Sequence, residues 1–246
     1  MLETWLFRIR SYARFLLHSG NTLGFGVHSP RLFYLANTII PEQARYYCFE
    51  AIENQRARLR NSNADARERE RAELPRREAQ LLFRLAIWLH ARTIVETGLS
   101  MGLTTAYLAM ADSHAQVYTC YEGAPTLRSA RHVWKELGIK NIHVEEEGGV
   151  FPSITQDGAE KPLVDLAFLS ASTSSEAVLQ AFDSLSAYAG EESVLVIDDI
   201  RHDKQRYQVW KTISLRDGVT TTFDLGRMGL VFFDRHLPKQ RFGIRM

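Results

Sequence analysis

An acidic residue and a glycine-containing turn follow the first strongly apolar run in the second third of the chain. The run TIVET contains Glu96 near its end, and the turn from Gly98 to Gly102 leads into an apolar segment with helical spacing. Glycines in such a turn let a ligand approach the backbone closely, and a helix start offers unpaired N–H groups. Because tight turns of this kind occur in any α/β protein, the turn alone does not distinguish a ligand site from a structural turn.

A second acidic residue stands at the end of the next apolar run. Glu122 follows the segment VYTCY. Ligands of open α/β sheets bind at the carboxyl ends of the strands, where a carboxylate can accept hydrogen bonds from vicinal ribose hydroxyls. The turn and the acid together indicate a ribose-bearing ligand. The glycine spacing is not G-x-G-x-x-G, which argues against an NAD-dependent enzyme.

Strand-like and helix-like segments alternate after Arg92. The expected strands are TIVET, QVYTCY, NIHVE, VDLAFL and SVLVID, and the expected crossover helices lie between them, one of them around residues 150–158. Five strands and four crossovers predict a mostly parallel sheet with helices on both faces. Residues 219–234, VTTTFDLGRMGLVFFD, predict an antiparallel hairpin on the sheet edge.

The N-terminal part of the chain has helical patterns instead. Residues 2–19 have the spacing of an amphipathic helix, which we expect to pack on the main domain or on a second subunit; a membrane-surface helix is the alternative. A second helix is predicted from Pro30, capped by Ser29, to about Ile40. Pro41 is expected to open a third helix.

This third helix continues into a charged run over residues 54–76, whose signs are nearly balanced. The run predicts a solvated helix or a connector. We therefore expect an N-terminal helical extension over residues 1–75 and a main domain over residues 76–246.

Composition and charge exclude several classes of protein. The chain has 246 residues, 30 basic and 29 acidic, so its charge makes no case for nucleic acid as the main partner. No apolar stretch is long enough to span a bilayer, and arginines interrupt the apolar N-terminal segment, which argues against a signal peptide. Cys48 and Cys120 fit no metal-ligand spacing. We expect a soluble, cytoplasmic protein.

Four motifs in this order carry a resemblance to a known family. They are ETGLSMGLTTAYLA, VYTCYEG, SVLVIDDI and the tail FDLGRMGLVFFD with PKQRFGIRM. They resemble class I S-adenosylmethionine-dependent methyltransferases, and more narrowly an O-methyltransferase-like bacterial group of the Bacteroidetes type, which also carries a segment like GFGVHSPRLFYL. The resemblance implies a Rossmann-like methyltransferase sheet of seven strands, mostly parallel with the seventh antiparallel, and S-adenosylmethionine as the cofactor.

The resemblance also implies which residues bind this cofactor. Its methionine and ribose side would be lined by four residues, Glu96, Gly98, Ser100 and Gly102. Glu122 would bind the ribose hydroxyls, and Gly123 would shape the adenine side. The two remaining positions of the predicted cofactor site are Glu147, near the adenine amine, and Ser170, at the end of the fourth strand.

The sequence departs from the family pattern at two positions near the expected catalytic centre. Relatives usually end the fourth strand in Asp-Gly, and this chain has Ser170 and Ala171 there. In metal-dependent relatives that Asp joins a pair after the next strand, retained here as Asp198 and Asp199. A neutral serine offers no charge to offset the dehydration of Mg²⁺, so we expect no metal.

A histidine that relatives often carry directly after DDI is also displaced. Arg201 stands at that position and cannot accept a proton, whereas His202 follows it. The residues that could take a proton from an acceptor are therefore Asp198, Asp199 and His202. The alternative interpretation of His202 is an exposed residue at the start of a helix.

We accordingly predict an S-adenosylmethionine-dependent methyltransferase that acts on a small-molecule acceptor, at oxygen and without a metal. The alternative is a catalytically inactive protein of the same fold that serves as a binding or interaction module. The replaced strand-four residues and the displaced histidine favour this alternative. We expect no nucleic-acid or membrane partner, and a homodimer formed through the N-terminal helices.

Overall fold

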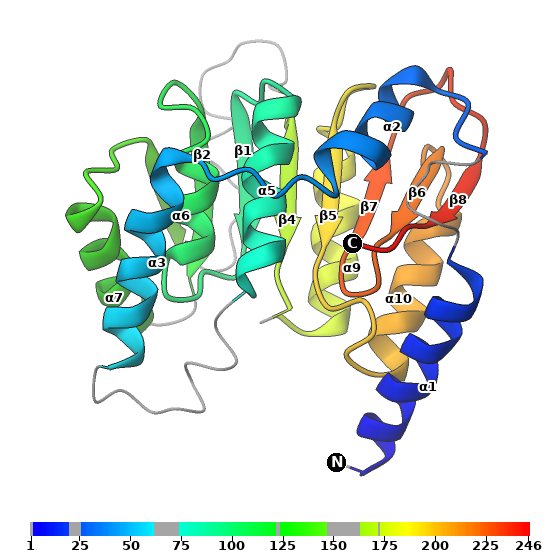
Figure 1. Cartoon of the computed structure of the whole chain (residues 1–246), viewed down its shortest axis with the longest axis horizontal. Helices are drawn as coiled ribbons and strands as arrows, with labels where there is room; N and C mark the ends of the chain where they lie inside the picture. Colours follow the sequence, from blue (N-terminus) through cyan, green and yellow to red (C-terminus); the bar gives the residue numbers. More distant parts are fainter. Residues whose placement is uncertain (1, 20–25, 62–73, 122–123, 147–162, 172) are drawn as a thin grey trace. The chain divides into compact units, whose positions relative to one another are not determined.

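The computed structural model describes the chain apart from residues 1, 20–25, 62–73, 122–123, 147–162 and 172 (Figure 1). Its helices are α1 (Leu2–His18), α2 (Pro30–Tyr34), the π-helical turn η1 (Leu35–Ile39), α3 (Tyr47–Arg60), α5 (Arg76–Trp88), α6 (Leu103–Ala109), α7 (Ala124–Glu136), α9 (Ser175–Ser186) and α10 (Lys204–Leu215). Its strands are β1 (Thr93–Thr97), β2 (Gln116–Tyr121), β3 (Ile142–Glu146), β4 (Leu166–Leu169), β5 (Val194–Ile197), β6 (Thr221–Asp224), β7 (Gly229–Phe232) and β8 (Gln240–Gly243). All five predicted strands after Arg92 are confirmed within a residue or two at their ends.

The strands form a mixed sheet in the order β3-β2-β1-β4-β5-β7-β6-β8. β1 pairs with β2 and β2 with β3 in parallel, whereas β7 pairs antiparallel with both β5 and β6. The predicted α/β class and antiparallel hairpin are confirmed. The predicted count of seven strands is wrong, because the described residues contain eight.

The additional strand is β8, which pairs in parallel with β6 from Thr221 opposite Gln240 to Asp224 opposite Gly243. Consequently the β6–β7 hairpin does not form the edge of the sheet, which is β8 instead. The segment QRFG is too short and too polar to show a strand pattern in the sequence. It becomes a strand because the free edge of β6 offers backbone hydrogen-bond partners.

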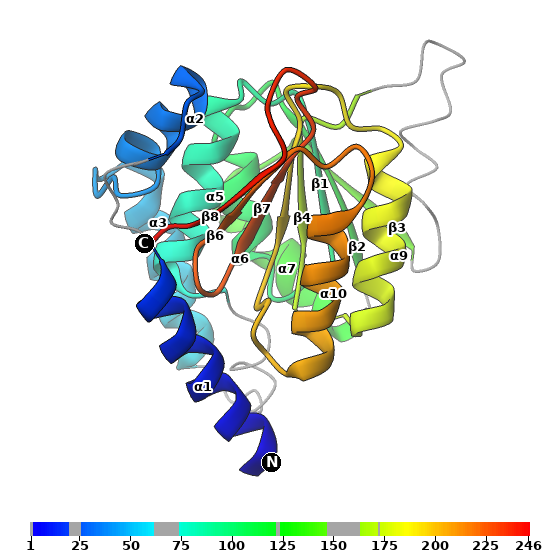
Figure 2. The same cartoon turned by 90° about the vertical axis from the view of Figure 1, so that its right-hand side faces the viewer.

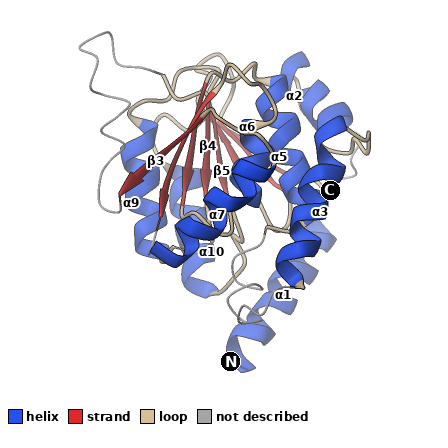
Figure 3. Ribbon diagram, turned by 90° about the vertical axis from the view of Figure 1, so that its left-hand side faces the viewer, coloured by secondary structure: helices blue, strands red, loops and turns tan. Residues whose placement is uncertain are grey.

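The chain divides into two compact units. The middle unit comprises residues 43–166, and the terminal unit comprises residues 1–42 and 167–246. In the middle unit α6 packs against both α3 and α5 (Figure 3). In the terminal unit α9 and α10 lie side by side, and α9 also packs on β5 (Figure 2). The predicted boundary near residue 75 stays a prediction.

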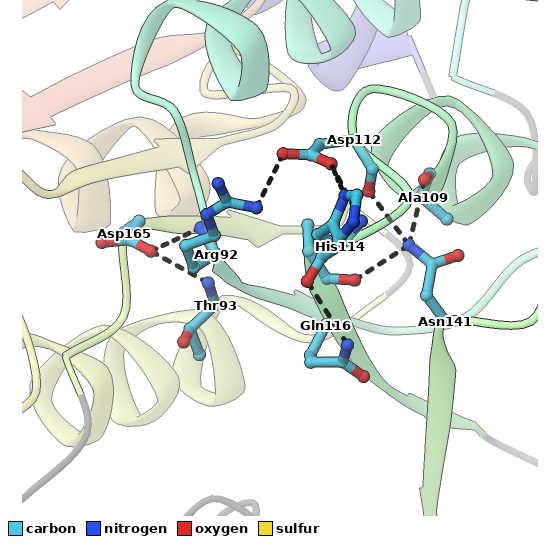
Figure 4. A network of polar contacts seen from close by, with 9 residues as sticks. Arg92, Thr93, Ala109, Asp112, His114, Gln116, Asn141 and Asp165 are labelled. Carbon is cyan, nitrogen blue, oxygen red and sulfur yellow. Dashed lines mark hydrogen bonds and ion pairs between the residues drawn. The ribbon is translucent and has the colours of Figure 1, made fainter.

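The amino ends of the strands in the middle unit are joined by a polar network (Figure 4). Asp165 Oδ2, directly before β4, accepts hydrogen bonds from the backbone N–H groups of Arg92 (2.7 Å) and Thr93 (2.9 Å). Asn141, directly before β3, donates from Nδ2 to three carbonyl oxygens, those of Ala109, Asp112 and Ala115. These side chains satisfy backbone carbonyl and N–H groups at the ends of α6 and β1 and in the adjoining loops. The loops at this end are thereby held, and the opposite, carboxyl ends carry the predicted site residues.

The N-terminal helices are partly as predicted. The capping role of Ser29 is confirmed, because its Oγ accepts a hydrogen bond from Leu32 N at 3.4 Å and Pro30 occupies the first turn of α2. The predicted third helix does not begin at Pro41. α3 begins at Tyr47 instead, and the chain is non-helical from Pro41 to Tyr46. Pro41 ends the preceding helical segment, because proline lacks the N–H group that would continue it. The charged run predicted as a helix or connector lies partly outside the described residues.

Within the terminal unit, α1 packs on α10 and on the loop before β7 through its aromatic side chains. The buried Phe15 contacts the loop at Gly226, and Phe7 lies 6.0 Å from the Tyr207 ring on α10. At the C-terminal end of α1, Arg245 Nε donates to Ser19 Oγ at 2.9 Å. Packing on the main part of the protein, one of the two predicted roles of this helix, is thus confirmed. Among the described residues, no helix combines the length and apolar character that crossing a membrane requires.

Candidate functional site

Glu96 is a buried carboxyl group that joins three elements of the middle unit. Its Oε2 accepts hydrogen bonds from Thr105 Oγ1 on α6 at 2.5 Å and from Thr119 Oγ1 on β2 at 3.1 Å. Burial raises the pKa of Glu96 to about 7, although the two threonine hydrogen bonds act to lower it. The side chain therefore holds β1, β2 and the first turn of α6 together. Its predicted place beside a cofactor stays a prediction.

The turn after β1 is fixed by contacts of its backbone. Gly98 and Gly102 have φ values of 75° and 82°, a left-handed conformation that glycine adopts without strain. The Leu99 N–H donates to the carbonyl oxygen of Cys120 at 2.8 Å, which ties the turn to the end of β2. Between these anchors, Ser100 is half-buried.

Gly102 has a second, steric reason to be glycine. A Cβ atom at this position would lie 2.8 Å from Ala130 Cα and from Trp134 Nε1 on α7. Trp134 Nε1 also donates to the Gly102 carbonyl oxygen at 2.9 Å. Helix packing therefore requires a glycine here in addition to the left-handed φ. The sequence shows the glycine but not α7, whose position comes from the tertiary structure.

Three predicted cofactor residues lie outside the described residues. They are Glu122, Gly123 and Glu147. The structure describes β2 up to its last residue, Tyr121, which directly precedes Glu122. Their predicted roles remain predictions.

Ser170 follows β4 in the terminal unit. Its side chain is half-buried, and its carbonyl oxygen accepts a hydrogen bond from Thr173 Oγ1 at 3.0 Å. This hydrogen bond links the end of β4 to a residue shortly before α9. The residue thus lies at the carboxyl end of its strand, as predicted.

Asp198, directly after β5, is held in a bidentate ion pair. Arg227 Nε donates to Asp198 Oδ1 at 2.8 Å and its terminal nitrogen donates to Oδ2 at 3.0 Å. The Asp198 side chain is 5% exposed and that of Arg227 is 31% exposed. Both carboxylate oxygens thus accept charge-assisted hydrogen bonds from one guanidinium, and Oδ1 also accepts from the Asp199 N–H at 2.7 Å.

The sequence contained no signal for this pairing. Arg227 precedes β7 by two residues, and the antiparallel register of β5 and β7, with Ile197 opposite Gly229, brings it next to the residues that follow β5. The Ile200 N–H also donates to the Arg227 carbonyl oxygen at 2.9 Å. Only the strand pairing places the two segments together.

Asp199 has a different environment from that of Asp198. Its backbone is left-handed, with φ of 42°, a conformation in which aspartate is tolerated better than most residues. Its Oδ2 lies 3.7 Å from a terminal nitrogen of Arg8 on α1, farther than a hydrogen bond reaches. The Asp199 carboxylate is therefore near a cation without being saturated by one. Backbone strain of this kind is found at functional sites.

His202 and Arg201 both have structural contacts. His202 is exposed, and its Nδ1 lies 2.9 Å from Asp203 Oδ2 at the N-cap of α10. Partial burial acts to raise the pKa of Asp203, but hydrogen bonds from the Arg206 backbone and from His202 hold it below its ordinary value. Arg201 forms a bidentate pair with Asp224, at 2.7 and 2.6 Å. These contacts favour the helix-start role of His202 over a catalytic role.

A hollow of about 600 Å³ lies beside Asp199 in the terminal unit. One wall is an apolar stripe on α1, made of Trp5, Ile9, Tyr12 and Leu16, all of them exposed despite their size. The same helix contributes the charge of Arg8, and the other wall carries the charges of Asp199, Arg201 and Arg227. Mostly apolar hollows of this size with a few converging polar groups are the usual form of small-molecule sites. The sequence predicted that α1 is an amphipathic helix, but it did not predict that the apolar side of α1 lines a hollow beside Asp199.

A group of three residues elsewhere could share a cation by distance. Glu191, Asp234 and His236 place ligand atoms within 4.8 Å of one another among the described residues. Two of the three are exposed, and the group is separate from Ser170, Asp198 and Asp199. Exposed acidic groups of this kind occur commonly without a metal.

The sequence matches no protein-family model and no curated protein. Its fold, however, is similar to those of solved O-methyltransferases. The O-methyltransferase from Bacillus cereus in complex with S-adenosylhomocysteine has a TM-score of 0.59 and 16% identity, covering 81% of this chain and 95% of that chain. The O-methyltransferase TomG from Streptomyces achromogenes, which is involved in tomaymycin synthesis and is in complex with S-adenosylmethionine, has a TM-score of 0.58 and 14% identity over 82% and 95%.

A third similar structure is an S-adenosylhomocysteine-bound methyltransferase from Podospora anserina, with a TM-score of 0.60 and 11% identity over 84% of this chain and 96% of that chain. The chain thus has the Rossmann-like α/β fold that these methyltransferases share. At such identities the likeness establishes the fold. The predicted Bacteroidetes-type group stays a prediction.

Proposed function

We propose that this chain is an S-adenosylmethionine-dependent methyltransferase that methylates an oxygen of a small acceptor without a divalent metal. The observation that most supports this function is the likeness to solved methyltransferases holding S-adenosylmethionine or S-adenosylhomocysteine, over 81% to 84% of this chain. The order of the motifs along the fold agrees with it: a glycine turn follows β1, an acid follows β2 and an acidic pair follows β5.

The turn after β1 fits such a cofactor. Gly98 and Gly102 allow the backbone to bend sharply at the strand end, and the Leu99 contact with Cys120 holds the turn in place. Glu122 would accept hydrogen bonds from the ribose hydroxyls. When bound, the cofactor would supply a methyl group on a sulfonium; the acceptor oxygen would bond to the methyl carbon as the carbon–sulfur bond breaks and S-adenosylhomocysteine leaves.

The hollow beside Asp199 supports an acceptor site in the terminal unit. Its apolar wall on α1 would hold the acceptor and exclude water, and Asp199 would take the proton that the acceptor hydroxyl loses as the carbon–oxygen bond forms. We assign this role to Asp199 rather than Asp198, because Arg227 engages both oxygens of Asp198. The proton then passes from Asp199 to solvent.

The same ion pair supports metal independence. A divalent cation at this strand end would need the oxygens of Asp198, which face Arg227 at 2.8 and 3.0 Å. Ser170 adds only a neutral hydroxyl in place of a third carboxylate. The donor set does not fit Mg²⁺, and the proposed reaction contains no metal step.

Cofactor binding tests the first part of the proposal. Isothermal titration with S-adenosylhomocysteine should show micromolar binding by the wild-type protein and by the control variant Glu50→Ala, an exposed residue of α3. Binding should be lost in Glu122→Ala and should not change between Mg²⁺ and EDTA. A folded wild-type protein that gives no heat would overturn the proposed function.

Turnover tests the second part. A panel of small hydroxylated acceptors should identify a substrate, with release of S-adenosylhomocysteine as the readout. Methylation of that substrate should be at least tenfold slower in Asp199→Asn, which corresponds to about 1.4 kcal/mol in the activation free energy. Cofactor binding without turnover on any acceptor would instead support the inactive binding module. The predicted dimer stays a prediction, tested by comparing gel-filtration masses with and without residues 1–20.

A further inference from the structure

The terminal unit contains a second hollow, which is formed by α1, α10 and β8. Its volume is about 410 Å³. β8 is the strand that the sequence did not predict, and α1 is docked beside it by the contact of Arg245 with Ser19. Without these two elements the hollow would not exist.

Positive charge converges on this hollow from three elements. Arg14 and His18 come from α1, Lys211 from α10 and Arg241 from β8, and all four side chains are exposed. Among the described residues, Arg14, Lys211 and Arg241 form no ion pair with an acid, and Lys211 Nζ lies 4.8 Å from the centre of the Tyr207 ring. The chain as a whole carries a net charge of only +1, so this local excess is not a consequence of its composition.

The buried floor of the hollow does not compensate this charge. Asp224 is the acidic residue of the lining, and its two carboxylate oxygens are engaged by Arg201 at 2.7 and 2.6 Å. Arg201 is itself 7% exposed, and its buried Nε has no hydrogen-bond partner among the described residues. Three cations therefore share a hollow whose carboxylate is already neutralised.

Aromatic and hydroxyl groups complete the lining. Phe15, Trp210 and Phe242 supply apolar surface, and Ser11 supplies a half-buried hydroxyl. The His18 Nδ1 donates to the Arg14 carbonyl oxygen at 2.8 Å, which leaves Nε2 as the remaining polar atom of the ring. The hollow thus offers a charged part for an anion and an apolar part for an organic group.

We propose that this hollow is a binding site for a small organic phosphate monoester. A phosphate dianion offsets more of the charge of Arg14, Lys211 and Arg241 than a carboxylate monoanion does, and its three terminal oxygens can each accept from a separate cation. The volume lies within the range of small-molecule pockets, which suits a phosphate with an attached ring better than a macromolecule. The site goes beyond the proposed methyl transfer, and it uses none of the predicted cofactor residues.

Phenyl phosphate is a suitable probe, because it combines the dianion with one aromatic ring. Titration at constant ionic strength should show saturable binding to the full chain, weaker binding of phenyl sulfate, a monoanion of the same shape, and none of phenol. Saturating S-adenosylhomocysteine should leave this binding unchanged, which separates the site from the proposed cofactor site and keeps the two proposals independently testable.

The double variant Lys211→Gln/Arg241→Gln should bind phenyl phosphate about tenfold or more weakly, as expected when two charge-assisted hydrogen bonds are lost. Lys204→Gln is the matched control, because Lys204 is an exposed lysine of the same helix outside the hollow. Circular dichroism should show the same spectrum for the wild type and both variants, because all the substituted side chains are exposed. Absence of saturable binding, equal affinity of the double variant, equal binding of phenol, or displacement by S-adenosylhomocysteine would each overturn the proposal.

Discussion

Arg227 donates hydrogen bonds to both carboxylate oxygens of Asp198, from Nε to Oδ1 at 2.8 Å and from a terminal nitrogen to Oδ2 at 3.0 Å, in a nearly buried pair. Among the described residues, the neighbouring Asp199 forms an ion pair with Arg8, at the longer distance of 3.7 Å. Two adjacent acids that look equivalent in the sequence are therefore different in chemistry. This difference is the reason for proposing Asp199 rather than Asp198 as the residue that accepts the acceptor proton.

Removal of Arg227 should destabilise the protein. Arg227→Gln leaves the buried Asp198 carboxylate without its partner, which we expect to cost about 3 kcal/mol in the free energy of unfolding. The matched control is Arg216→Gln, whose pair with Asp183 has side chains 43% and 47% exposed and should lose less than about 1 kcal/mol. Urea unfolding measures both values. Equal losses in the two variants would contradict a buried, strongly coupled pair.

Glu96 should make the stability depend on pH below neutrality. Burial raises its pKa from an ordinary value near 4.5 to about 7 in the folded state, so between these values the folded state binds more protons than the unfolded state. The contribution of Glu96 to stability is then full below pH 4.5 and declines as pH rises to about 7, by about 3 kcal/mol at 1.36 kcal/mol for each pH unit.

Unfolding measurements of wild type and Glu96→Gln across this pH interval would test the effect. The free energy of unfolding of the wild type relative to the variant should fall with rising pH and become constant above neutrality. A difference that is flat between pH 4.5 and 7 would show that the Glu96 carboxyl is already ionised in the folded protein.

Gly102→Ala should be more damaging than other glycine substitutions with a left-handed backbone. Its Cβ would meet Ala130 and Trp134 at 2.8 Å, in addition to the strain of φ 82°. Gly218→Ala, at φ 86° with no atom near its Cβ, carries the backbone strain alone. We expect losses of about 1–2 kcal/mol for Gly218→Ala and about 1–3 kcal/mol more for Gly102→Ala. Similar melting temperatures for the two variants would show that α7 moves away freely.

Asn141 should be important for the loops at the amino ends of the strands. Its Nδ2 donates to three carbonyl oxygens at 3.0, 3.2 and 2.9 Å, and Asn141→Ala would leave them without this donor, at about 2–3 kcal/mol. Asn37→Ala removes one exposed bond of 2.9 Å to the Phe33 carbonyl and should cost about 1 kcal/mol at most. Chemical denaturation distinguishes the two. A larger loss at Asn37 would contradict the bracing role of Asn141.

The apolar stripe on α1 should control acceptor affinity if the hollow beside Asp199 is the acceptor site. Trp5→Ala removes an aromatic wall and should raise the KM for the acceptor about tenfold, which corresponds to 1.4 kcal/mol. Its kcat should change little, because Trp5 holds the acceptor without taking part in proton transfer. Leu17→Ala is the control, since Leu17 lies on the same helix and is 82% exposed. An unchanged KM in Trp5→Ala would exclude this wall from the acceptor site.

Local sequence patterns were sufficient for most elements of the fold. The five strands after Arg92, the hairpin, the amphipathic α1 and the Ser29 cap each depend on residues close together in the chain, and all are present in the structure. Two predictions failed where a neighbour decided the outcome. Residues 240–243 became a strand because β6 has a free edge, and Pro41 ended a helical segment instead of opening one.

The candidate site shows the same division. Apolar runs, glycines and acids at strand ends predicted the class of fold and the positions of Glu96, Gly98 and Gly102, because strand and turn formation are governed by neighbouring residues. Asp198 and Asp199 were predicted through the family resemblance. The tertiary structure alone decided that Arg227 pairs with Asp198, that Trp134 packs on Gly102 and that α1 forms two hollows with α10, β8 and Asp199. Such contacts join residues far apart in the chain, and their partners are selected by strand register and packing, which no local pattern contains.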